Sequence, residues 1–444
     1  MIQKKNPANL TEGSIVRGLL GFAVPLFLGQ LLQQLYNMAD AWVVGNFAEN
    51  EAFAAVSMAS HISFLIIGFF NGIAIGGGVV ISRYFGAKNE KETERAIHTN
   101  FLFGIGASVL STIVGVLLVP RLLVWMHTPE SVMPHALVYF RIYFGGVSTI
   151  IMYNICMAIM RALGDSLHPL YYLIVSSCMN VALDLLFVAG FHWGVGGAAV
   201  ATVLSQGLSA VLCKIKDYTG LDFRKLKIYR DVLSQVIHQG LPSGLQNSVI
   251  SIGNLVVQAN INSFGAYAIS GHGAYSKIEG LVFLPIMSMS MALPTFISQN
   301  LGAGEYRRAK KGAFFGIMSG MVMAELVGLV LYAGCGQALQ LFVDTPEAIR
   351  FGMIHGHTVA LFFFLLAFSH CAAGVMRGCG KAMIPMAVML ASWCGIRIVY
   401  VTAALKVVNE FQMISWAYPL TWTISSGAFL YYMKKIDWTR GFES

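Results

Sequence analysis

The chain has 444 residues, of which 56% are hydrophobic and only 11% are charged, and its mean hydropathy is +0.67. Soluble domains carry about 25% charged residues, so this composition excludes a soluble protein and indicates a polytopic membrane protein. The formal net charge of +8 would suit a nucleic-acid-binding protein only if the basic residues formed one patch, and their distribution along the chain excludes this.

Hydrophobic segments, taken in chain order, predict an all-α protein with twelve membrane-spanning helices. Spans of about 25 residues would use roughly 300 residues, which leaves no room for a large soluble domain. The predicted spans are 18–45, 53–82, 97–119, 135–160, 168–189, 195–213, 236–262, 270–299, 313–334, 350–376, 382–405 and 411–433.

Most of the 29 lysines and arginines fall in alternate connections between these spans. The basic connections include the one between the second and third spans and the one between the sixth and seventh. The positive-inside rule places these connections, and both termini, in the cytoplasm. The basic charge therefore reflects topology in a cell membrane, and we expect the lipid bilayer rather than a nucleic acid as the partner.

The chain repeats itself after about 216 residues. Ile81–Ala87 matches Ile297–Ala303, and the turn Met160–Asp165 matches Met376–Lys381. Pro25 and Pro242 occupy matching places early in the first helix of each half. Each half has an even number of spans, so the sequence predicts two six-helix lobes related by a parallel repeat, with a cleft between them. The predicted boundaries are 1–213 for the N-terminal lobe, 214–235 for a cytoplasmic linker and 236–444 for the C-terminal lobe.

The same motifs carry a family resemblance. The run Ser82–Asn89, its copy Ser298–Gly304 and the two Met-Arg-x-x-Gly turns resemble the MATE (multidrug and toxic compound extrusion) transporters over essentially the whole chain. The resemblance implies a monomeric exporter that exchanges H⁺ or Na⁺ for small organic, often cationic, compounds by alternating access, without a further cofactor and without enzymatic activity.

Two carboxylates inside the predicted spans of the N-terminal lobe are candidates for cation coupling, because ionisable groups in hydrocarbon are costly and are usually functional. Asp40 continues a polar face with Gln33 and Asn37, and Asp184 continues one with Ser177 and Asn180. Two such faces can meet inside one lobe and enclose a site rich in oxygen atoms. Two neighbouring carboxylates titrate as a unit and suit either H⁺ or Na⁺.

The repeat provides an internal control for this assignment. Asp40 aligns with Val257, Asp184 with Tyr400 and Thr202 with Trp422, so the second copy lacks the polar set. We therefore predict that coupling belongs to the N-terminal lobe. The alternative is that both carboxylates are hydrogen-bonded packing groups.

The resemblance favours the DinF-like branch of the family, because another branch relies on carboxylates in spans 7, 8 and 10 and this chain has only Glu279, in span 8. In the DinF-like branch, the matching positions Asp40, Asn180, Asp184 and Thr202 form the proton or sodium site. The resemblance also suggests that Pro25 is a hinge at which the first helix bends. Substrate is expected to contact Gln33, Tyr36, Asn37, Asn154, Ser177, Asn254 and Gln258.

Three further charged residues inside spans, Glu279, Glu325 and Arg397, receive no assigned role. Two other functions compete with drug export. A flippase for lipid-linked precursors would need a strongly cationic cleft, and the spans offer only Arg141 and Arg397. An integral membrane enzyme would need a catalytic motif, and neither His-Glu-x-x-His nor Gly-x-Ser-x-Gly occurs in the sequence.

Overall fold

The computed structural model describes residues 9–47, 50–125, 128–214, 221 and 226–440, and within these ranges the chain forms helices and no strand. This agrees with the predicted all-α class, because helices satisfy their own backbone polar groups in hydrocarbon. Seven described helices are long and apolar enough to cross a membrane, and two bent helix pairs raise the number to nine. Together with α2 (Asn50–Gly86), α8 (Arg230–Asn262) and α15 (Phe411–Lys435), these nine segments coincide with the twelve predicted spans.

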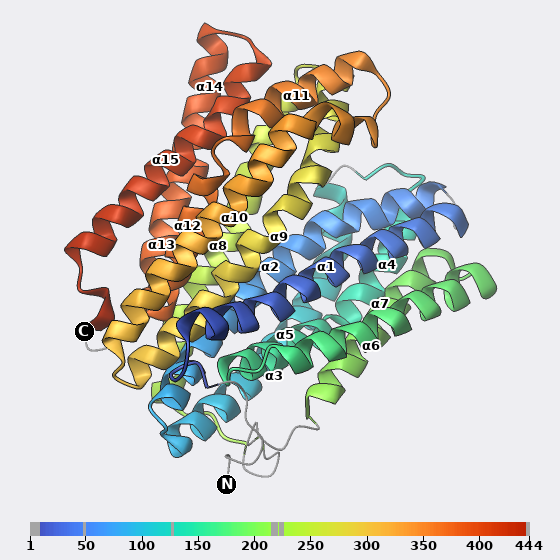
Figure 1. Ribbon diagram of the computed structural model, residues 1–444. Coiled ribbons are helices and arrows are strands. Elements are labelled where there is room, and N and C mark those ends of the chain that lie inside the picture. The colour runs from blue at the N-terminus through green and yellow to red at the C-terminus, as the bar shows by residue number, and fades with distance from the viewer. Residues whose placement is uncertain (1–8, 48–49, 126–127, 215–220, 222–225, 441–444) are drawn as a thin grey trace. The chain divides into compact units, whose positions relative to one another are not determined.

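The chain divides into two compact units, and Figure 1 shows their helices in the colours of the sequence. The first unit is Leu28–Gly240 with the residues that precede Leu10. It contains the second part of α1 and the first turns of α8. The helices concerned are α1 (Ile15–Phe47), α2 (Asn50–Gly86), α3 (Glu90–Trp125), α4 (Met133–Gly145), α5 (Val147–Ala162), α6 (Leu167–Asp184), a π-helical turn η1 (Leu185–Gly190), α7 (Gly194–Lys214) and α8 (Arg230–Asn262).

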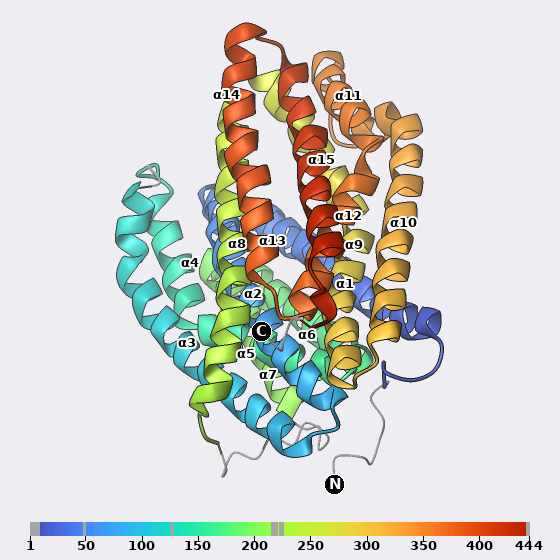
Figure 2. The same cartoon turned by 90° about the vertical axis from the view of Figure 1, so that its left-hand side faces the viewer.

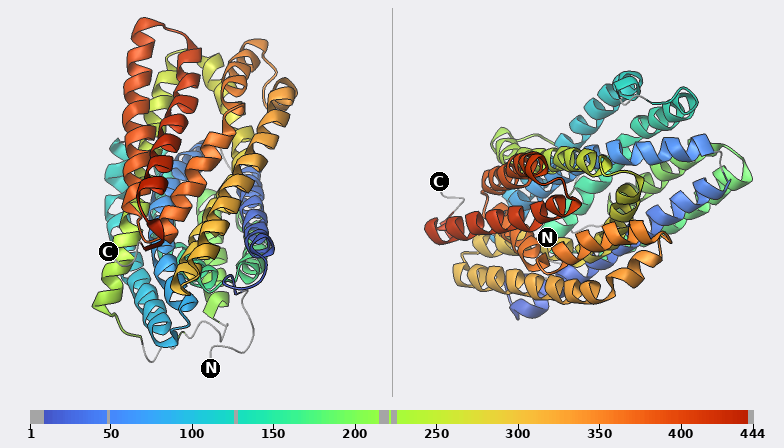
Figure 3. Two further views of the ribbon diagram at one scale, coloured as in Figure 1. Left: turned by 60° about the vertical axis from the view of Figure 1, so that its left-hand side comes forward. Right: turned by 90° about the horizontal axis from the view of Figure 1, so that it is seen from above.

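The second unit is Leu10–Phe27 together with Leu241–Ser444. Helices α14 and α15 run side by side in it (Figure 2), as do α9 and α10 (Figure 3). Its further elements are α9 (Ala266–Gly302), α10 (Tyr306–Gln340), α11 (Pro346–Ala360), α12 (Phe363–Gly378), α13 (Met383–Met389), a π-helical turn η3 (Leu390–Ile396), α14 (Arg397–Val407), α15 (Phe411–Lys435) and a short 3₁₀ turn η4 (Trp438–Arg440).

Two predicted spans are not single straight helices. The span 135–160 is the pair α4 and α5, which are bent by 44°, and the span 350–376 is the pair α11 and α12, which are bent by 58°. At the first bend, a Cβ atom on Gly146 would lie 2.3 Å from the Val203 side chain, so only glycine allows this close approach to α7. At the second, the Phe364 N–H donates to Glu325 Oε2 at 3.2 Å, which satisfies a backbone donor at the start of α12.

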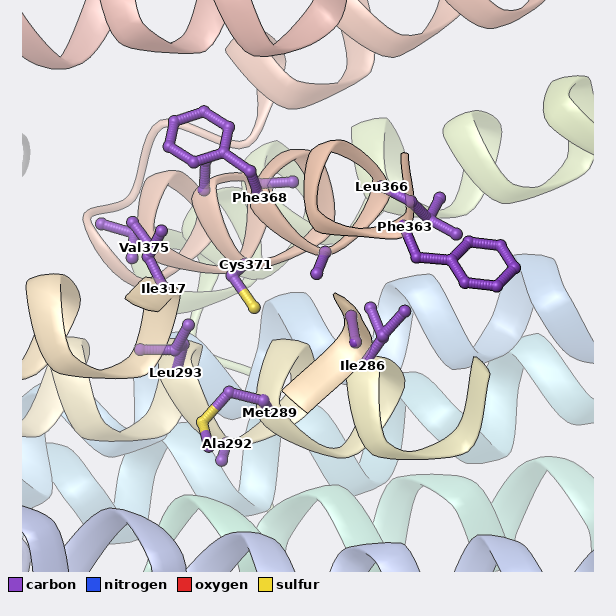
Figure 4. Packing of buried hydrophobic residues seen from close by; sticks show 14 of the residues in the cluster. Ile286, Met289, Ala292, Leu293, Ile317, Phe363, Leu366, Phe368, Cys371 and Val375 are labelled. Carbon is purple, nitrogen blue, oxygen red and sulfur yellow. The ribbon is translucent and has the colours of Figure 1, made fainter. Parts of the chain in front are cut away.

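The core of the second unit lies where α12 packs on α9 (Figure 4). Cys371 points from α12 toward Met289 and Leu293 of α9, and all three side chains are buried. A Cβ atom on Gly374 would lie 2.7 Å from the Ser290 carbonyl oxygen, so the two helices touch through backbone. Helices in a membrane gain stability from such close packing, because lipid removes most of the hydrophobic driving force between them.

An arginine explains why the start of α1 belongs to the second unit. Arg308 of α10 donates hydrogen bonds to the carbonyl oxygens of Leu10, Glu12 and Gly13 at 2.6–3.2 Å. Asn300 of α9 donates to the Leu10 carbonyl as well, at 3.2 Å. Because charged donors make strong hydrogen bonds, these contacts fix the segment that leads into α1.

The first unit holds the start of α8 in a related way. Arg95 of α3 forms a salt bridge with Asp231 at 2.9 Å and lies over the ring of Tyr229 at 4.3 Å. The Tyr229 N–H donates to Thr99 Oγ1 at 3.2 Å. The first unit therefore holds the start of α8, the first long helix of the second half of the sequence, and the second unit holds the segment that leads into α1, the first helix of the first half. Both starts are predicted to lie on the cytoplasmic side.

The predicted lobe boundaries differ from the compact units in this respect. Residues Leu10–Phe27 lie in the predicted N-terminal lobe but pack with the second unit, and α8 begins at Arg230, inside the predicted linker. Residues 215–220 and 222–225 of that linker lie outside the described residues.

Candidate functional site

The first half of the site is a face of α1. Gln33 and Asn37 are exposed, and Tyr36 and Asp40 are half-buried. The Tyr36 hydroxyl lies near Gln206 of α7. Tyr36 and Asp40 are one turn apart, so the phenol and the carboxyl project from α1 to the same side.

The second half comes from α6. Asn180 is 1% exposed and Asp184 is fully buried, and their spacing of four residues places them on one face. The α-helix ends at Asp184 and continues as the π-helical turn η1. Such turns are rare and often occur at functional sites, because the extra residue changes the direction of neighbouring side chains.

The structure brings the two predicted carboxyls together. Asp40 and Asp184 lie within hydrogen-bonding reach of each other. No N–H or hydroxyl donor among the described residues bonds to either carboxyl oxygen of Asp184, nor to Oδ1 of Asp40. Two carboxylates in contact cannot both stay charged without a compensating cation. One proton shared between them, or one metal cation, meets this requirement.

Further buried polar atoms on α6 and α7 have no partner within the part of the chain that the structure describes. They are both amide atoms of Asn180, the Ser177 hydroxyl and the Gln206 carbonyl oxygen. Buried polar groups are normally hydrogen-bonded, so a group of them without partners indicates a site for water or an ion. The predicted residues Asp40, Ser177, Asn180 and Asp184 all belong to this group.

Two predicted residues are turned toward their own helices instead. The Thr202 hydroxyl donates to the Ala198 carbonyl at 3.1 Å, and the Asn154 amide donates to the Ile150 carbonyl at 2.9 Å. In this conformation Thr202 therefore donates no hydrogen bond to either carboxyl. Its oxygen keeps lone pairs that can bind a cation, and its predicted role stays a prediction.

Three tyrosines without a predicted role lie near Tyr36 or the carboxyls. Tyr139, Tyr143 and Tyr153 are each less than 10% exposed and are electrostatic neighbours of Tyr36 or of the carboxyl pair. The rings of Tyr139 and Tyr143 stack at a centroid distance of 5.9 Å. Their spacing of four residues in α4 is the sequence signal that could have identified them, since it places both on the buried face.

The second unit has a polar centre of a different kind. Arg397 is 2% exposed and lies with its guanidinium 4.4 Å from the centre of the Tyr418 ring. It donates to Thr421 Oγ1 at 3.1 Å and to Asn254 Oδ1 at 3.4 Å. Of the two predicted substrate residues of α8, Asn254 is exposed. The other, Gln258, donates a hydrogen bond to Asn262 Oδ1 at 2.9 Å.

The two remaining acidic residues in spans differ in environment. Glu279 is an electrostatic neighbour of Arg397 but forms no ion pair with it within 4 Å in the described structure. Glu325 accepts the hydrogen bond at the start of α12 and so has a structural role. The described residues contain no group of three His, Cys, Asp or Glu side chains that could hold a metal ion.

Comparisons with known proteins identify the family of the chain. The model of the MatE family matches residues 25–186 and 242–402, one segment in each half. The chain is 27% identical to a protein of Bacillus subtilis (strain 168) named "Probable multidrug resistance protein YpnP", over 96% of both chains. It is 24% identical to "Probable multidrug resistance protein NorM" of Thermotoga maritima, over 90% of this chain and 87% of that one.

The fold also matches a solved structure. A MOP superfamily transporter from Pyrococcus furiosus superposes with a TM-score of 0.90 over the full length of both chains, at 20% sequence identity. At this identity the likeness concerns the fold, which has twelve helices in two lobes.

Proposed function

Because this chain belongs to the MatE family of membrane transporters, we propose that it is a cation-coupled antiporter that exports small organic, often cationic, compounds by alternating access. Its relatives named as multidrug resistance proteins support drugs and toxic compounds as the cargo. The distribution of basic residues supports a plasma-membrane orientation with both termini in the cytoplasm. We further propose that one chain is the working unit.

The contact between the carboxyls of Asp40 and Asp184 is the observation that carries the proposal. The pair sits inside one unit, on two different helices, and three of its carboxyl oxygens accept no hydrogen bond from the described residues. A proton satisfies the pair by forming a hydrogen bond between the carboxyls. A sodium ion would satisfy it through oxygen ligands from Asp40, Asn180, Asp184 and Thr202, because hard cations prefer oxygen.

Exchange follows because the coupling ion and a cationic cargo compete for the negative charge of the same carboxyl pair. A cationic cargo near Gln33, Tyr36 and Asn37 would be attracted by an ionised Asp40, which lies on the same helix. Binding of H⁺ or Na⁺ neutralises the carboxyl pair and removes that attraction. The coupling ion and a cationic cargo thus stabilise different charge states of one site, which is the differential affinity that exchange requires.

Helix α1 is suited to transmit the change. Its start is held in the second unit by Arg308, while Asp40 belongs to the first unit. The division between units falls after Phe27, two residues beyond the buried Pro25. Proline removes one backbone hydrogen bond and so permits bending at this point. We propose Pro25 as the hinge.

The test is efflux from proteoliposomes that contain the purified protein, with a proton gradient or a sodium gradient imposed separately. A fluorescent organic cation such as an esterified rhodamine serves as the cargo. We expect one gradient or both to drive efflux, and Asp40→Asn to remove the gradient dependence. Glu325→Gln is the matched control, because it removes a carboxylate from the second unit while its amide oxygen can still accept the Phe364 N–H. Equal efflux with and without either gradient would refute coupled transport.

A further inference from the structure

The export mechanism above uses the first unit and leaves a cavity of the second unit without a role. This cavity has a volume of about 880 Å³ and is formed by the end of α10, by α11 with the bend that follows it, and by the start of α15. All of these elements belong to the second unit, in which α11 packs against α15. Ligand pockets in proteins measure about 300–1,000 Å³, so the cavity is large enough for an organic ligand.

The outer end of the cavity has the features of a membrane–water interface. The connection between the predicted spans 313–334 and 350–376 contains no lysine or arginine, so the positive-inside rule predicts that it faces away from the cytoplasm. In this connection Leu341 is 80% exposed and Phe342 is 44% exposed, and Trp416 of the cavity wall is 41% exposed. Exposed aromatic side chains, tryptophan above all, are enriched at the level of the lipid headgroups.

The cavity has the length of one lipid leaflet. Its lining begins at Pro346, the first residue of α11, and continues to Leu361 and Phe362 at the bend before α12. The 15 residues of α11 extend over about 22 Å, at about 1.5 Å per residue. A bilayer is about 40–45 Å thick with its headgroups, so one leaflet has about the same length.

The inner part of the cavity is suited to hydrocarbon. Its apolar lining is Ile349, Met353, Ile354, Leu361, Phe362 and Trp416. The polar groups among them have partners within the protein. Gln412 Nε2 donates to Thr358 Oγ1 at 3.1 Å, and the Thr358 hydroxyl donates to the Ile354 carbonyl at 2.7 Å. His357 packs on the ring of Tyr332 at a centroid distance of 4.5 Å.

The outer part of the cavity has two opposite charges that do not pair. Asp344 precedes α11, Arg350 lies in the second turn of α11, and both side chains are exposed and line the cavity. Neither forms a hydrogen bond or an ion pair within 4 Å among the described residues. A guanidinium can hold a phosphate by two hydrogen bonds, and a carboxylate accepts hydrogen bonds from an ammonium. A ligand with both charges would therefore match this end of the cavity.

The internal repeat shows that the fold does not require these groups. Thr128–Glu130 matches Thr345–Glu347, which aligns Arg350 with Met133. The alignment of Thr202 with Trp422 likewise aligns Trp416 with Gly196. The first copy therefore lacks both the guanidinium and the indole. A group that the shared framework needs would be expected in both copies, so the amphipathic cavity is a feature of the second unit alone.

We propose that this cavity binds one phospholipid whose zwitterionic headgroup has a primary ammonium, in the leaflet opposite the cytoplasm. The phosphate lies on Arg350, the ammonium lies on Asp344, and the upper part of one acyl chain lies against Leu361 and Phe362. A primary ammonium donates three hydrogen bonds, whereas a trimethylated one donates none, so the site distinguishes the two headgroups. An anionic lipid without the ammonium would bring its phosphate near Asp344 with nothing to offset the repulsion. The site depends on the membrane topology and not on the export function.

Lipid binding to the purified full-length protein in detergent tests the proposal. Native mass spectrometry gives the affinities of dioleoyl phosphatidylethanolamine, phosphatidylcholine and phosphatidylglycerol. We expect phosphatidylethanolamine to bind at least about fivefold more tightly than phosphatidylcholine. Arg350→Gln should weaken all three lipids, because each has a phosphate. Asp344→Asn should weaken phosphatidylethanolamine at least about fivefold and strengthen phosphatidylglycerol, because it removes a partner of the ammonium and a repulsive charge at once.

The matched control is Arg121→Gln, which removes an exposed arginine that is predicted on the same side of the membrane but lies in the first unit. It should change none of the three affinities. Equal affinities for the three lipids in the unmodified protein would overturn the proposal, and this measurement needs no variant. Equal weakening of phosphatidylethanolamine and phosphatidylglycerol by Asp344→Asn would show a merely structural role and would overturn it as well.

Two further measurements identify the occupant and its place. Glycerophosphoethanolamine has the same headgroup without acyl chains, and we expect it not to displace the lipid, because each buried methylene adds to the affinity. Displacement at equal concentration would replace the lipid by a water-soluble ligand. Phosphatidylethanolamine with brominated acyl chains should quench tryptophan fluorescence less in Trp416→Phe than in the unmodified protein. Equal quenching in both would show that the lipid binds elsewhere, and the proposal would fail.

Discussion

The two units contain opposite charges at related places. In the first unit, Asp184 comes directly before the π-helical turn η1, and in the second, Arg397 comes directly after the π-helical turn η3. Both turns follow the helix that begins after a Met-Arg-x-x-Gly motif. The two halves therefore share a backbone irregularity, while the charge beside it is acidic in one unit and basic in the other. A duplicated framework can thus hold two sites of different chemistry.

Packing between helices shows the same pattern of shared framework and changed side chains. In the first unit, Gly78 of α2 faces Ala158 of α5; in the second, the repeat partners Pro294 of α9 and Gly374 of α12 face each other. A Cβ atom on Gly78 would lie 3.5 Å from the Ala158 carbonyl oxygen, whereas one on Gly374 would lie 2.7 Å from the Ser290 carbonyl oxygen. The second unit is therefore packed more closely at this contact.

The largest expected effect concerns the acidic pair. Asp40→Asn and Asp184→Asn should each reduce gradient-driven efflux to the level of protein-free vesicles, because a single carboxyl cannot share a proton in the same way. The double variant should be little worse than either single one, since residues that act as a unit are not additive. Rates per folded transporter in proteoliposomes check this. Additive losses in the double variant would show that the two carboxyls work separately.

The sequence could predict that the two carboxyl-bearing faces can meet, but not which other side chains surround the point where they do. Each carboxyl continues a polar helix face, and the spacing within α1 or α6 is a local property. Which faces meet depends on packing between helices, and the position of the α4 tyrosines beside them depends on the same packing. Thr202 shows why a family motif alone does not determine how a side chain is oriented, because its hydroxyl donates a hydrogen bond within α7 in this conformation.

The fold was likewise predictable only in part from the sequence. Hydropathy and the repeat predict twelve spans and two halves, because both signals are local or periodic. The 58° bend between α11 and α12 could not be predicted, since Leu361 and Phe362 at the break include neither glycine nor proline. A hydrogen bond from Phe364 to Glu325, 39 residues away, accompanies the bend. The placement of Leu10–Phe27 in the second unit likewise depends on distant contacts with Arg308.

The packing comparison predicts a difference in stability. Gly374→Ala should destabilise the protein by about 1–3 kcal/mol, because the new methyl group would meet backbone that cannot move independently. Gly78→Ala should be neutral or stabilising, since its methyl group would make an ordinary contact and alanine favours helix by about 1 kcal/mol. Thermal unfolding in one detergent compares the two variants. Equal melting temperatures would refute the closer packing at this contact of the second unit.

The repeat partners of the acidic pair test whether coupling is confined to the first unit. Val257 is 1% exposed and packs in a cluster with Ile261 and Val401, so Val257→Ala should cost about 1 kcal/mol of stability. Tyr400→Phe should cost less, since it removes only a hydroxyl. Neither variant should alter the dependence of efflux on proton or sodium gradients. A variant of Tyr400 that loses gradient dependence while Asp184→Asn retains it would place coupling in the second unit instead.

The last prediction concerns Pro25, at the boundary between the two units. Pro25→Ala restores a backbone donor to α1 and should slow efflux several-fold by making the helix resist bending. Cation binding should stay largely intact, because Asp40 lies about four turns further along at roughly 1.5 Å per residue. Pro242→Ala, at the matching position of α8, is the control and should leave the rate closer to that of the unmodified protein.

A static kink makes a different prediction from a hinge, and one measurement separates them. Spin labels placed on either side of Pro25 report the end-to-end distance of α1 as the coupling cation is added. A hinge predicts two distances whose populations shift with the cation, and a single distance in Pro25→Ala, because only a helix with a weakened hydrogen-bond ladder changes shape at low cost. A static kink predicts one distance in the unmodified protein and normal turnover in the surviving Pro25→Ala molecules. That outcome would separate the coupling site from α1 bending and leave the contact between Asp40 and Asp184 to act without it.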